Sequence, residues 1–305
     1  MTQTAKPLCG FINVLKPPGM SSAHVVGVVR RLLGGAKIGH AGTLDPEAAG
    51  VLPLMVGKAA RLFDYMQDKE KAYVTEVAFG TATDTQDAQG VVIARGDNPP
   101  DEAAVLAALP RFTGIIWQTP PMFSALKQDG KRLYELARDG KQAEIPAREV
   151  TVHELAFRGM TERYGALLSV RCSKGFYVRT LCHDLGEAVG CPAHMRFLLR
   201  TQSGPFTLAT AHTLEELRQA AEDGRLQDML LPPEAALSHL PMMDLPRRLE
   251  KPVRNGGRLE WARFSAVRDT SAAEGTPFGL RIDGVLSAIA QRSEDTVRVR
   301  TWLGE

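Results

Sequence analysis

The residue whose type and setting most favour chemistry is Asp45, which lies in a glycine-rich stretch, GHAGTLDPEAAGVLP, at 39–53. Glycine lets a backbone approach a ligand closely, and loops on a rigid scaffold often carry catalytic side chains. The stretch therefore predicts a loop that aims one carboxylate at a bound molecule. Asp followed by Pro is also typical of a helix start, with Asp45 as the cap and Pro46 at the first position. The residues alone leave both interpretations open.

This loop and several motifs elsewhere in the chain together form one pattern of residues. Within the loop, the pattern comprises Gly39, His40, Gly42, Leu44, Asp45, Pro46, Gly50, Leu52 and Pro53. Elsewhere it comprises Lys16-Pro17 with GMSS at 19–22, Lys71-Ala72-Tyr73, TDTQDAQG at 83–90, PPMFSALKQDGK at 120–131, CSKGFYVRT at 172–180, Asp184-Leu185-Gly186 and Ala193-His194. Together these motifs resemble the TruB-type family of tRNA pseudouridine synthases, densely from about residue 10 to 205.

The resemblance implies an enzyme that isomerises one uridine, position 55 in the T loop of tRNA, with three catalytic residues. Asp45 would be the catalytic carboxylate, acting as a nucleophile at C1′ or C6 or as a base for the 2′ proton. Arg179 would be the cation that keeps this carboxylate charged in a dry pocket. Tyr73 would stack on the extruded uracil, its hydroxyl placed to help remove the C5 proton. By local sequence alone, Arg179 is also typical of an ordinary ion pair and Tyr73 of a core aromatic.

The same resemblance implies a set of substrate-binding residues. His40 would stack into the RNA in place of the flipped nucleotide, which offsets part of the unstacking cost. Tyr177 and Leu198 would line the base pocket. The turn lysines of the matched motifs suit contacts with phosphate groups. These lysines are Lys16, Lys127, Lys131 and Lys174.

The chain departs from the family pattern at one position. The family often carries Leu-Arg-Arg after the Ala-His pair, whereas this chain has Leu198-Leu199-Arg200. Because one arginine is missing, no role is transferred to Leu199.

Pseudouridine formation transfers no electrons and consumes no second substrate, so no cofactor and no metal are expected. The sequence accordingly contains no dinucleotide fingerprint or P-loop. A nucleosidase or glycoside hydrolase would also act at an anomeric carbon, but it needs paired carboxylates. Only Glu47 is close to Asp45 in sequence, whereas Asp84 and Asp87 lie in a polar turn. An RNA-binding module without turnover remains a second alternative.

The composition places the chain among ordinary globular proteins. Of 305 residues, 44% are apolar and 24% charged, and the net charge is +2, so RNA-binding charge must be concentrated locally. The four cysteines form no C-x-x-C pair, which argues against a zinc site. No signal peptide and no apolar run of about 20 residues occur. We therefore expect a cytoplasmic protein without a membrane segment.

The partner expected from the resemblance is the T arm of tRNA. Relatives that depend on guide RNAs require partner proteins, and their long basic tails are missing here. A stand-alone enzyme of the bacterial type follows, acting as a monomer with no obligatory protein partner.

The periodicity of apolar residues, together with capping and turn residues, predicts the helices and strands around the loop at 36–53. Helices are expected at 23–33 with Ser22 as cap, 102–109 with Asp101 as cap, 131–139, about 180–189, and after a capping box from Thr213 to Glu216. Strands are expected at 73–79, 91–94 as its hairpin or meander neighbour, 166–172, 261–268, 285–290 and 296–302.

These elements predict an α/β (α+β) protein of two domains. Residues 1–240 would form a pseudouridine synthase catalytic domain, with a mixed, largely antiparallel sheet flanked by helices and a cleft where Asp45 meets Arg179. Residues 245–305 would form a small β-rich, PUA-like RNA-binding domain. A basic stretch, RRLEKPVRNGGR at 247–258, is expected to be a loop that reaches phosphates or a solvated linker. Removal of the second domain is expected to spare the active site.

Overall fold

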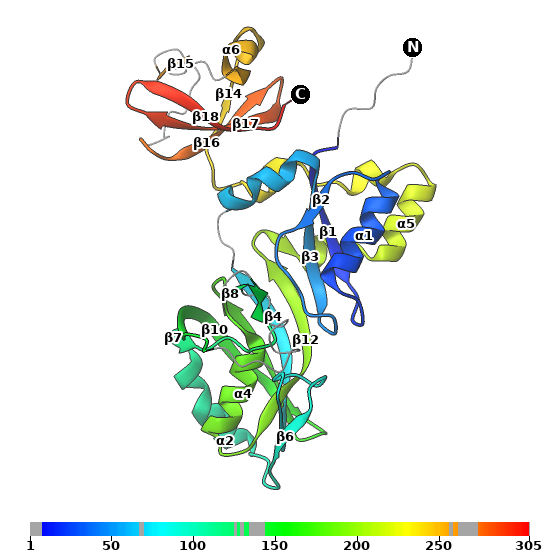
Figure 1. The fold of residues 1–305 in the computed structure, drawn as a ribbon, viewed down its shortest axis with the longest axis vertical. Helices are drawn as coiled ribbons and strands as arrows, with labels where there is room; N and C mark the ends of the chain where they lie inside the picture. Colours follow the sequence, from blue (N-terminus) through cyan, green and yellow to red (C-terminus); the bar gives the residue numbers. More distant parts are fainter. Residues whose placement is uncertain are drawn as a thin grey trace.

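The computed structural model describes residues 8–66, 70–124, 127–128, 131–133, 144–255, 259–261 and 274–304. A large twisted sheet runs through the molecule, and a smaller sheet built from the C-terminal residues forms a lobe at one end (Figure 1). Among the described helices, none is both long and apolar enough to cross a bilayer.

The large sheet carries the loop of Asp45 between two of its strands. Its main path runs β1 (Gly10–Lys16), β3 (Ala49–Val56), β12 (Ala193–Ser203), β4 (Lys71–Phe79), β11 (Gly165–Cys172), β10 (Arg148–Thr161) and β7 (Gly114–Gln118). Two short strands join it at the side, β2 (Ile38–His40) on β3 and β13 (Phe206–Thr207) on β12. Only β3 and β12 pair in parallel in this sheet as described. The expectation of a mixed, largely antiparallel sheet is confirmed.

Four helices among the described residues cover this sheet. Two of them, α1 (Ser22–Leu32) and α5 (Leu214–Glu222), lie side by side against β1 and β2 (Figure 1). The other two, α2 (Glu102–Ala108) and α4 (Val178–Ala188), pack on the β4, β10 and β12 region. Their apolar faces belong to one buried core with the strands. The predicted caps form, because Asp101 accepts the Ala104 amide and Thr213 with Glu216 makes a full capping box.

Three sequence-based expectations about local structure were wrong. The cap of α1 is Ser21, whose side chain accepts the His24 amide, so the Ser22 side chain does not cap this helix. The predicted loop at 36–53 is shorter, since β2 and β3 occupy both of its ends. The strand at 91–94 is β6 (Val92–Arg95), and it pairs with β5 (Thr81–Thr83) rather than with 73–79. Gly80, with φ +95°, turns the chain between β4 and β5, which separates this ribbon from the large sheet.

The small sheet has the order β14 (Met242–Asp244), β16 (Pro277–Ile282), β17 (Val285–Ser293), β18 (Thr296–Trp302) and β15 (Leu259–Glu260). It has a core of its own, which includes Phe278, Leu280 and Ala290. The strands expected at 285–290 and 296–302 are therefore present. The basic stretch is not a loop where it is described, because it forms the 3-10 helix η6 (Arg247–Leu249) and the helix α6 (Glu250–Arg254). The strand expected at 261–268 lies outside the described residues after position 261. The helix expected at 131–139 is wrong at its start, because Lys131–Arg132 form a short strand that pairs with Lys127–Gln128, and the part after position 133 lies outside the described residues.

The small sheet packs on the long 3-10 helix η1 (Gly57–Tyr65), which directly follows β3. Arg61 donates to the Trp302 carbonyl at 2.9 Å, and the Tyr65 and Thr301 hydroxyls are 3.0 Å apart. Leu62 of η1 lies in one buried cluster with Leu286 and Ile289 of β17. The remaining short elements are η2 (Leu109–Phe112), η3 (Leu208–Thr210), η4 (Leu226–Met229), η5 (Pro233–Ala236), β8 (Lys127–Gln128) and β9 (Lys131–Arg132).

Candidate active site

The loop that carries Asp45 is fixed from below by the start of α1. The buried Ser22 hydroxyl accepts the Leu44 amide at 2.9 Å and donates to the Leu44 carbonyl at 3.0 Å. Leu44 itself is buried in the main core, next to Asp45 in the chain. The Ala48 amide donates to the Asp45 carbonyl at 3.1 Å, which closes a turn. The Asp45 backbone is therefore held on both sides while its side chain stays 37% exposed.

Lys16 supports the same loop from β1. Its side chain is fully buried, and its ammonium donates to the Pro17 and Pro46 carbonyls at 2.7 and 2.8 Å. Burial lowers the pKa of Lys16 to about 8, and the neighbouring Glu47 and Asp45 oppose that change. The prediction placed this ammonium on an RNA phosphate, but in the structure it lies beneath the loop. The physical reason is that a lysine at the end of a buried strand meets loop carbonyls before it can reach solvent.

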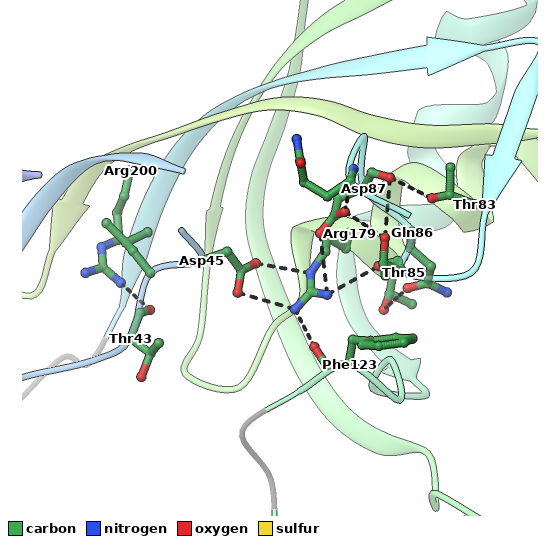
Figure 2. A network of polar contacts seen from close by, with 12 residues as sticks. Thr43, Asp45, Thr83, Thr85, Gln86, Asp87, Phe123, Arg179 and Arg200 are labelled. Atoms are coloured by element: carbon green, nitrogen blue, oxygen red, sulfur yellow. Dashed lines mark hydrogen bonds and ion pairs between the residues drawn. The ribbon is translucent and has the colours of Figure 1, made fainter. Parts of the chain in front are cut away.

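Arg179, the second residue of α4, meets Asp45 as predicted. Its Nε lies 3.1 Å from one carboxylate oxygen of Asp45 and its Nη2 lies 3.4 Å from the other (Figure 2). The guanidinium is almost fully buried, with a side-chain exposure of 7%. Such a two-pronged contact fixes the orientation of the carboxylate as well as its charge.

Three further groups surround the Arg179 guanidinium. It donates to the carbonyls of Thr85 at 3.2 Å and Phe123 at 3.0 Å, and its Nη1 lies 3.7 Å from Asp87 (Figure 2). Asp87 in turn accepts the Thr85 hydroxyl at 2.7 Å and the Gln89 amide at 3.0 Å. Arg179 is therefore held between two carboxylates, with Asp45 the more exposed of the two.

The protonation of Asp45 is set by opposing effects. Burial raises the pKa of the Asp45 carboxyl above the usual aspartate value, the Arg179 guanidinium counteracts this, and Asp87 adds to the rise. A carboxylate with this environment is less solvated than a surface aspartate yet has a fixed counter-ion. Such a group suits reaction with an electrophilic carbon or a proton.

Tyr73 lies in β4 with its side chain buried. Burial raises the pKa of Tyr73 to about 12, and the positive charge of Arg200 counteracts part of that rise. The phenol is consequently neutral over the whole physiological range. Its link to the loop of Asp45 runs through Arg200.

Arg200 is the residue of the site that the sequence reasoning missed. It is fully buried, and its guanidinium donates to the carbonyls of Val51 at 2.7 Å, Thr43 at 3.2 Å and Gly42 at 3.2 Å. The last two carbonyls belong to the loop of Asp45, so Arg200 ties β12 to that loop. The signal available in the sequence was an arginine two residues after the pocket candidate Leu198, in an otherwise strand-like run.

Comparison with known proteins identifies the chain. The model described as "TruB family pseudouridylate synthase (N terminal domain)" matches residues 30–178, and the model described as "tRNA pseudouridylate synthase B C-terminal domain" matches residues 179–238. A tRNA pseudouridine synthase B from Moorella thermoacetica is 50% identical over 81% of this chain and 82% of its own length. The chain belongs to the TruB family of pseudouridylate synthases. It is therefore an isomerase.

Other members and relatives of the TruB family agree in sequence and in fold. A tRNA pseudouridine synthase B from Geobacillus thermodenitrificans is 45% identical over 88% of this chain and 91% of its own length. A chain in a crystal structure of a Cbf5-Nop10-Gar1 complex superposes with a TM-score of 0.70 at 28% identity, covering 96% of this chain and 83% of that chain. A chain in the archaeal box H/ACA sRNP Nop10-Cbf5 complex gives 0.70 at 26% identity, covering 96% and 85%. The expected fold class and family are thus confirmed.

The remaining predicted residues of this TruB-family chain lie in different settings. His40 is half-buried in β2, its Nδ1 is buried without a partner among the described residues, and burial lowers the pKa of its imidazole. Tyr177 precedes α4, and its ring lies under the Arg148 guanidinium at 4.8 Å. Leu198 is part of the main core in β12. Lys174 is exposed in the turn before α4, whereas the side chains of Lys127 and Lys131 lie outside the described residues.

Proposed function

We propose that this TruB-family enzyme isomerises uridine 55 in the T loop of tRNA, with Asp45 as the catalytic carboxylate. The N1–C1′ bond breaks, the uracil turns, and a C5–C1′ bond forms; C5 then loses a proton and N1 gains one. The observation that supports this proposal most is the Asp45–Arg179 pair, in which a part-exposed carboxylate faces a buried guanidinium at 3.1 and 3.4 Å.

Asp45 can act in two ways with this geometry. As a nucleophile it attacks C1′ or C6 of the nucleotide, and as a base it removes the 2′ proton so that a glycal forms. Both routes require the ionised carboxylate, which Arg179 favours and burial disfavours. In this proposal Arg179 holds the reacting oxygens toward the sugar and stabilises their charge throughout.

Tyr73 stacks on the extruded uracil and keeps the detached base in place. With a pKa of about 12, its hydroxyl is protonated in the resting site. It therefore enters the reaction as a hydrogen-bond donor, and it takes the C5 proton only if its own proton moves on. Leu198 and Tyr177 complete the apolar wall of the base pocket. Because the hydroxyl is protonated in the resting site, we assign Tyr73 mainly to stacking on the base and only secondarily to proton transfer.

The proposal of a tRNA substrate rests on the relatives named tRNA pseudouridine synthase B and on residues suited to RNA. A neutral imidazole at His40, favoured by its lowered pKa, can stack in the place of a flipped nucleotide. The exposed Lys174 can reach a phosphate.

We propose further that the enzyme acts as a monomer without an obligatory protein partner, since its identity to the relatives named tRNA pseudouridine synthase B is 45–50%, against 26–28% to the Cbf5 chains.

A nucleosidase reaction would need a second carboxyl group able to protonate the leaving base. The nearest second carboxylate in the described site is Asp87, whose oxygens accept two hydrogen bonds and face Arg179. Asp87 contacts the Nη1 of Arg179, whereas Asp45 contacts Nε and Nη2, so the guanidinium separates the two carboxylates. This arrangement favours isomerisation over hydrolysis.

The deciding experiment is tritium release from tRNA labelled as [5-³H]uridine. Wild-type tRNA should lose tritium from one site, and tRNA in which the T-loop uridine 55 is replaced by cytidine should lose none. Release that continues from the altered tRNA would move the target to another position. Free uracil in the supernatant would instead favour the nucleosidase.

A further inference from the structure

Three cationic side chains lie close to one another near the loop of Asp45. They are Lys71 at the start of β4, Arg148 at the start of β10 and Arg200 of β12. Within the described ranges, none of the three forms an ion pair with Asp or Glu. Each of the other two cations lowers the pKa of Lys71, which indicates that both arginines repel the Lys71 ammonium.

The side chains differ in how much of their donor capacity is already used. Arg200 donates to three carbonyls. Arg148 donates to the Gly175 carbonyl and stacks on Tyr177, but its Nε is buried without a partner among the described residues. The Lys71 ammonium makes no hydrogen bond within the part of the chain that the structure describes. Lys71 therefore has three free donors.

Lys71 points at the loop of Asp45. A Cβ built on Gly42 would lie 3.8 Å from the Lys71 Cε, 3.9 Å from its Nζ and 3.8 Å from the Arg200 Nη1. The space over the Gly42 Cα is thus bounded by two cationic groups. Gly42 has φ +145°, a conformation that other residues rarely adopt, so this space stays free of a side chain.

Holding an ammonium in such a place is unfavourable for the free protein. Burial lowers the pKa of Lys71, and the nearby arginines lower it further. An anion in the space over Gly42 would offset both effects, because it would supply a counter-charge. In an RNA substrate the available anions are phosphodiesters, and RNA lies at this loop when its uridine is at Asp45.

We propose that the Lys71 ammonium, with Arg148 behind it, binds the phosphodiester next to the target uridine in the space over Gly42. The inference rests on the proposed function, since it requires the target uridine to be at Asp45. Lys71 is a substrate-positioning residue in this role: it fixes the backbone of the flipped nucleotide so that C1′ lies at the carboxylate.

The test uses synthetic T-arm RNAs in which one linkage at a time is an uncharged methylphosphonate. Each altered linkage follows a single 2′-deoxynucleotide, and the reference RNA has the same deoxynucleotide with an ordinary phosphate. Affinity is measured on the full chain with Asp45→Asn, so that binding is read without turnover. We expect one linkage beside uridine 55 at which loss of charge weakens binding about tenfold.

Adding Lys71→Met to this protein removes the charge and keeps most of the apolar stem. The altered and reference RNAs should then bind within about twofold of each other, because the protein no longer has the ammonium that would distinguish a charged linkage from an uncharged one. Lys71→Arg should restore the difference. Arg30→Met, at the far end of α1 from the loop, removes one exposed charge and should leave the tenfold difference unchanged.

Three results would overturn the proposal. One is a tenfold loss that persists at the same linkage in the Lys71→Met protein, and another is the absence of any sensitive linkage in the loop. The third is a Lys71→Met protein that melts at a lower temperature and binds the reference RNA far more than tenfold more weakly, which would indicate a structural lysine. Turnover of the all-ribose T-arm RNA by the Asp45 enzyme is measured separately, so failure there rejects the proposed function and leaves the binding result readable.

Discussion

At the scale of single residues, the side chains of the site are held in place by contacts with neighbouring charged groups and carbonyls. Asp87 and two carbonyls hold Arg179, and Arg179 holds Asp45. Arg200 holds the loop carbonyls, and its charge lowers the pKa of Tyr73. Because each contact is made in a buried setting, removal of one partner leaves the other uncompensated, which costs more than the contact itself contributes.

Asp45→Asn should abolish pseudouridine formation and leave tRNA affinity nearly unchanged. The amide has the same shape as the carboxylate, but it neither attacks carbon nor removes a proton. Tritium release and filter binding on the same preparation measure both effects. Substantial turnover by this variant would remove Asp45 from the mechanism.

Arg179→Lys should lower turnover by about a hundredfold, because an ammonium cannot reproduce the two-pronged contact with Asp45. Arg179→Met should lower it further and change its pH dependence. In the proposed mechanism the reacting form is the carboxylate, so activity should be lost as pH falls through the pKa of Asp45. Since burial raises that pKa and Arg179 counteracts the rise, removal of the cation should shift the acid limb of the rate profile to higher pH. An acid limb that stays in place would show that Arg179 does not set the charge of Asp45.

Tyr73→Phe should keep base stacking, so tRNA affinity should survive while turnover falls about a hundredfold if the hydroxyl takes part in proton transfer. Tyr73→Leu should lose stacking as well. Single-turnover rates separate the two roles. A Tyr73→Phe enzyme with the wild-type rate would limit Tyr73 to stacking, in agreement with its pKa of about 12.

At the scale of elements, the loop of Asp45 is positioned by α1, β1 and β12. Ser22 holds it from α1, Lys16 from β1 and Arg200 from β12. The parallel contact between β3 and β12 requires Gly50, because a Cβ there would lie 2.1 Å from the Arg200 carbonyl. The loop is therefore short and anchored at three points, which suits a carboxylate that must meet one carbon atom.

Adjacent serines at the start of α1 offer a matched test of this anchoring. Ser22→Ala removes both bonds to Leu44 and leaves buried backbone groups unpaired, so it should lower the free energy of unfolding by about 1–3 kcal/mol and also lower kcat. Ser21→Ala removes only the exposed helix cap and should cost about 1 kcal/mol with little effect on kcat. Denaturant melts and single-turnover rates compare the two. Equal kcat values would show that the Ser22 bonds do not position Asp45.

At the scale of the whole molecule, the small sheet is bound to the catalytic part through η1. Leu62 and Met55 lie in one cluster with Leu286 and Leu303, and β3, which carries Met55, continues directly from the loop of Asp45. The expectation that removal of residues from about 245 onward would spare the active site therefore does not fit the structure. A truncation would expose this shared core, so point substitutions are the better probe.

We propose that the exposed basic residues of the small domain bind tRNA phosphates. Replacing Arg248, Lys251 and Arg254 with glutamine should weaken tRNA binding and make it less dependent on salt. The slope of log affinity against log salt should fall by a little under one unit for each phosphate group that the protein no longer neutralises. The variant with Arg248→Lys, Lys251→Arg and Arg254→Lys keeps the charge and serves as the control. Affinity equal to wild type at every salt concentration would mean that this segment is only solvated.

Much of the architecture could be predicted from local pattern. Capping at Asp101 and Thr213, and strand-like runs such as 296–302, depend on residues that are near neighbours in sequence, so the pattern shows them. Ser22 was assigned to the cap of α1 because local sequence cannot tell which of two adjacent serines has a distant partner. The strand at 92–95 was given the wrong partner for a similar reason, since pairing depends on the turn at Gly80.

The sequence by itself determined the family and the identity of the loop with Asp45, because these lie in contiguous motifs whose residue types can be read directly. The meeting of Asp45 with Arg179 was expected from the resemblance, and the structure supplies its geometry. Only the tertiary structure decided the places of Lys16, Lys71 and Arg200. The sequence does not distinguish a basic residue that is solvated from one that is buried beneath a loop or one that lies at an anion-binding position. Its role is set by the carbonyls, charges and strands that the fold brings to it from more than a hundred residues away, as it does for Arg200 and Thr43.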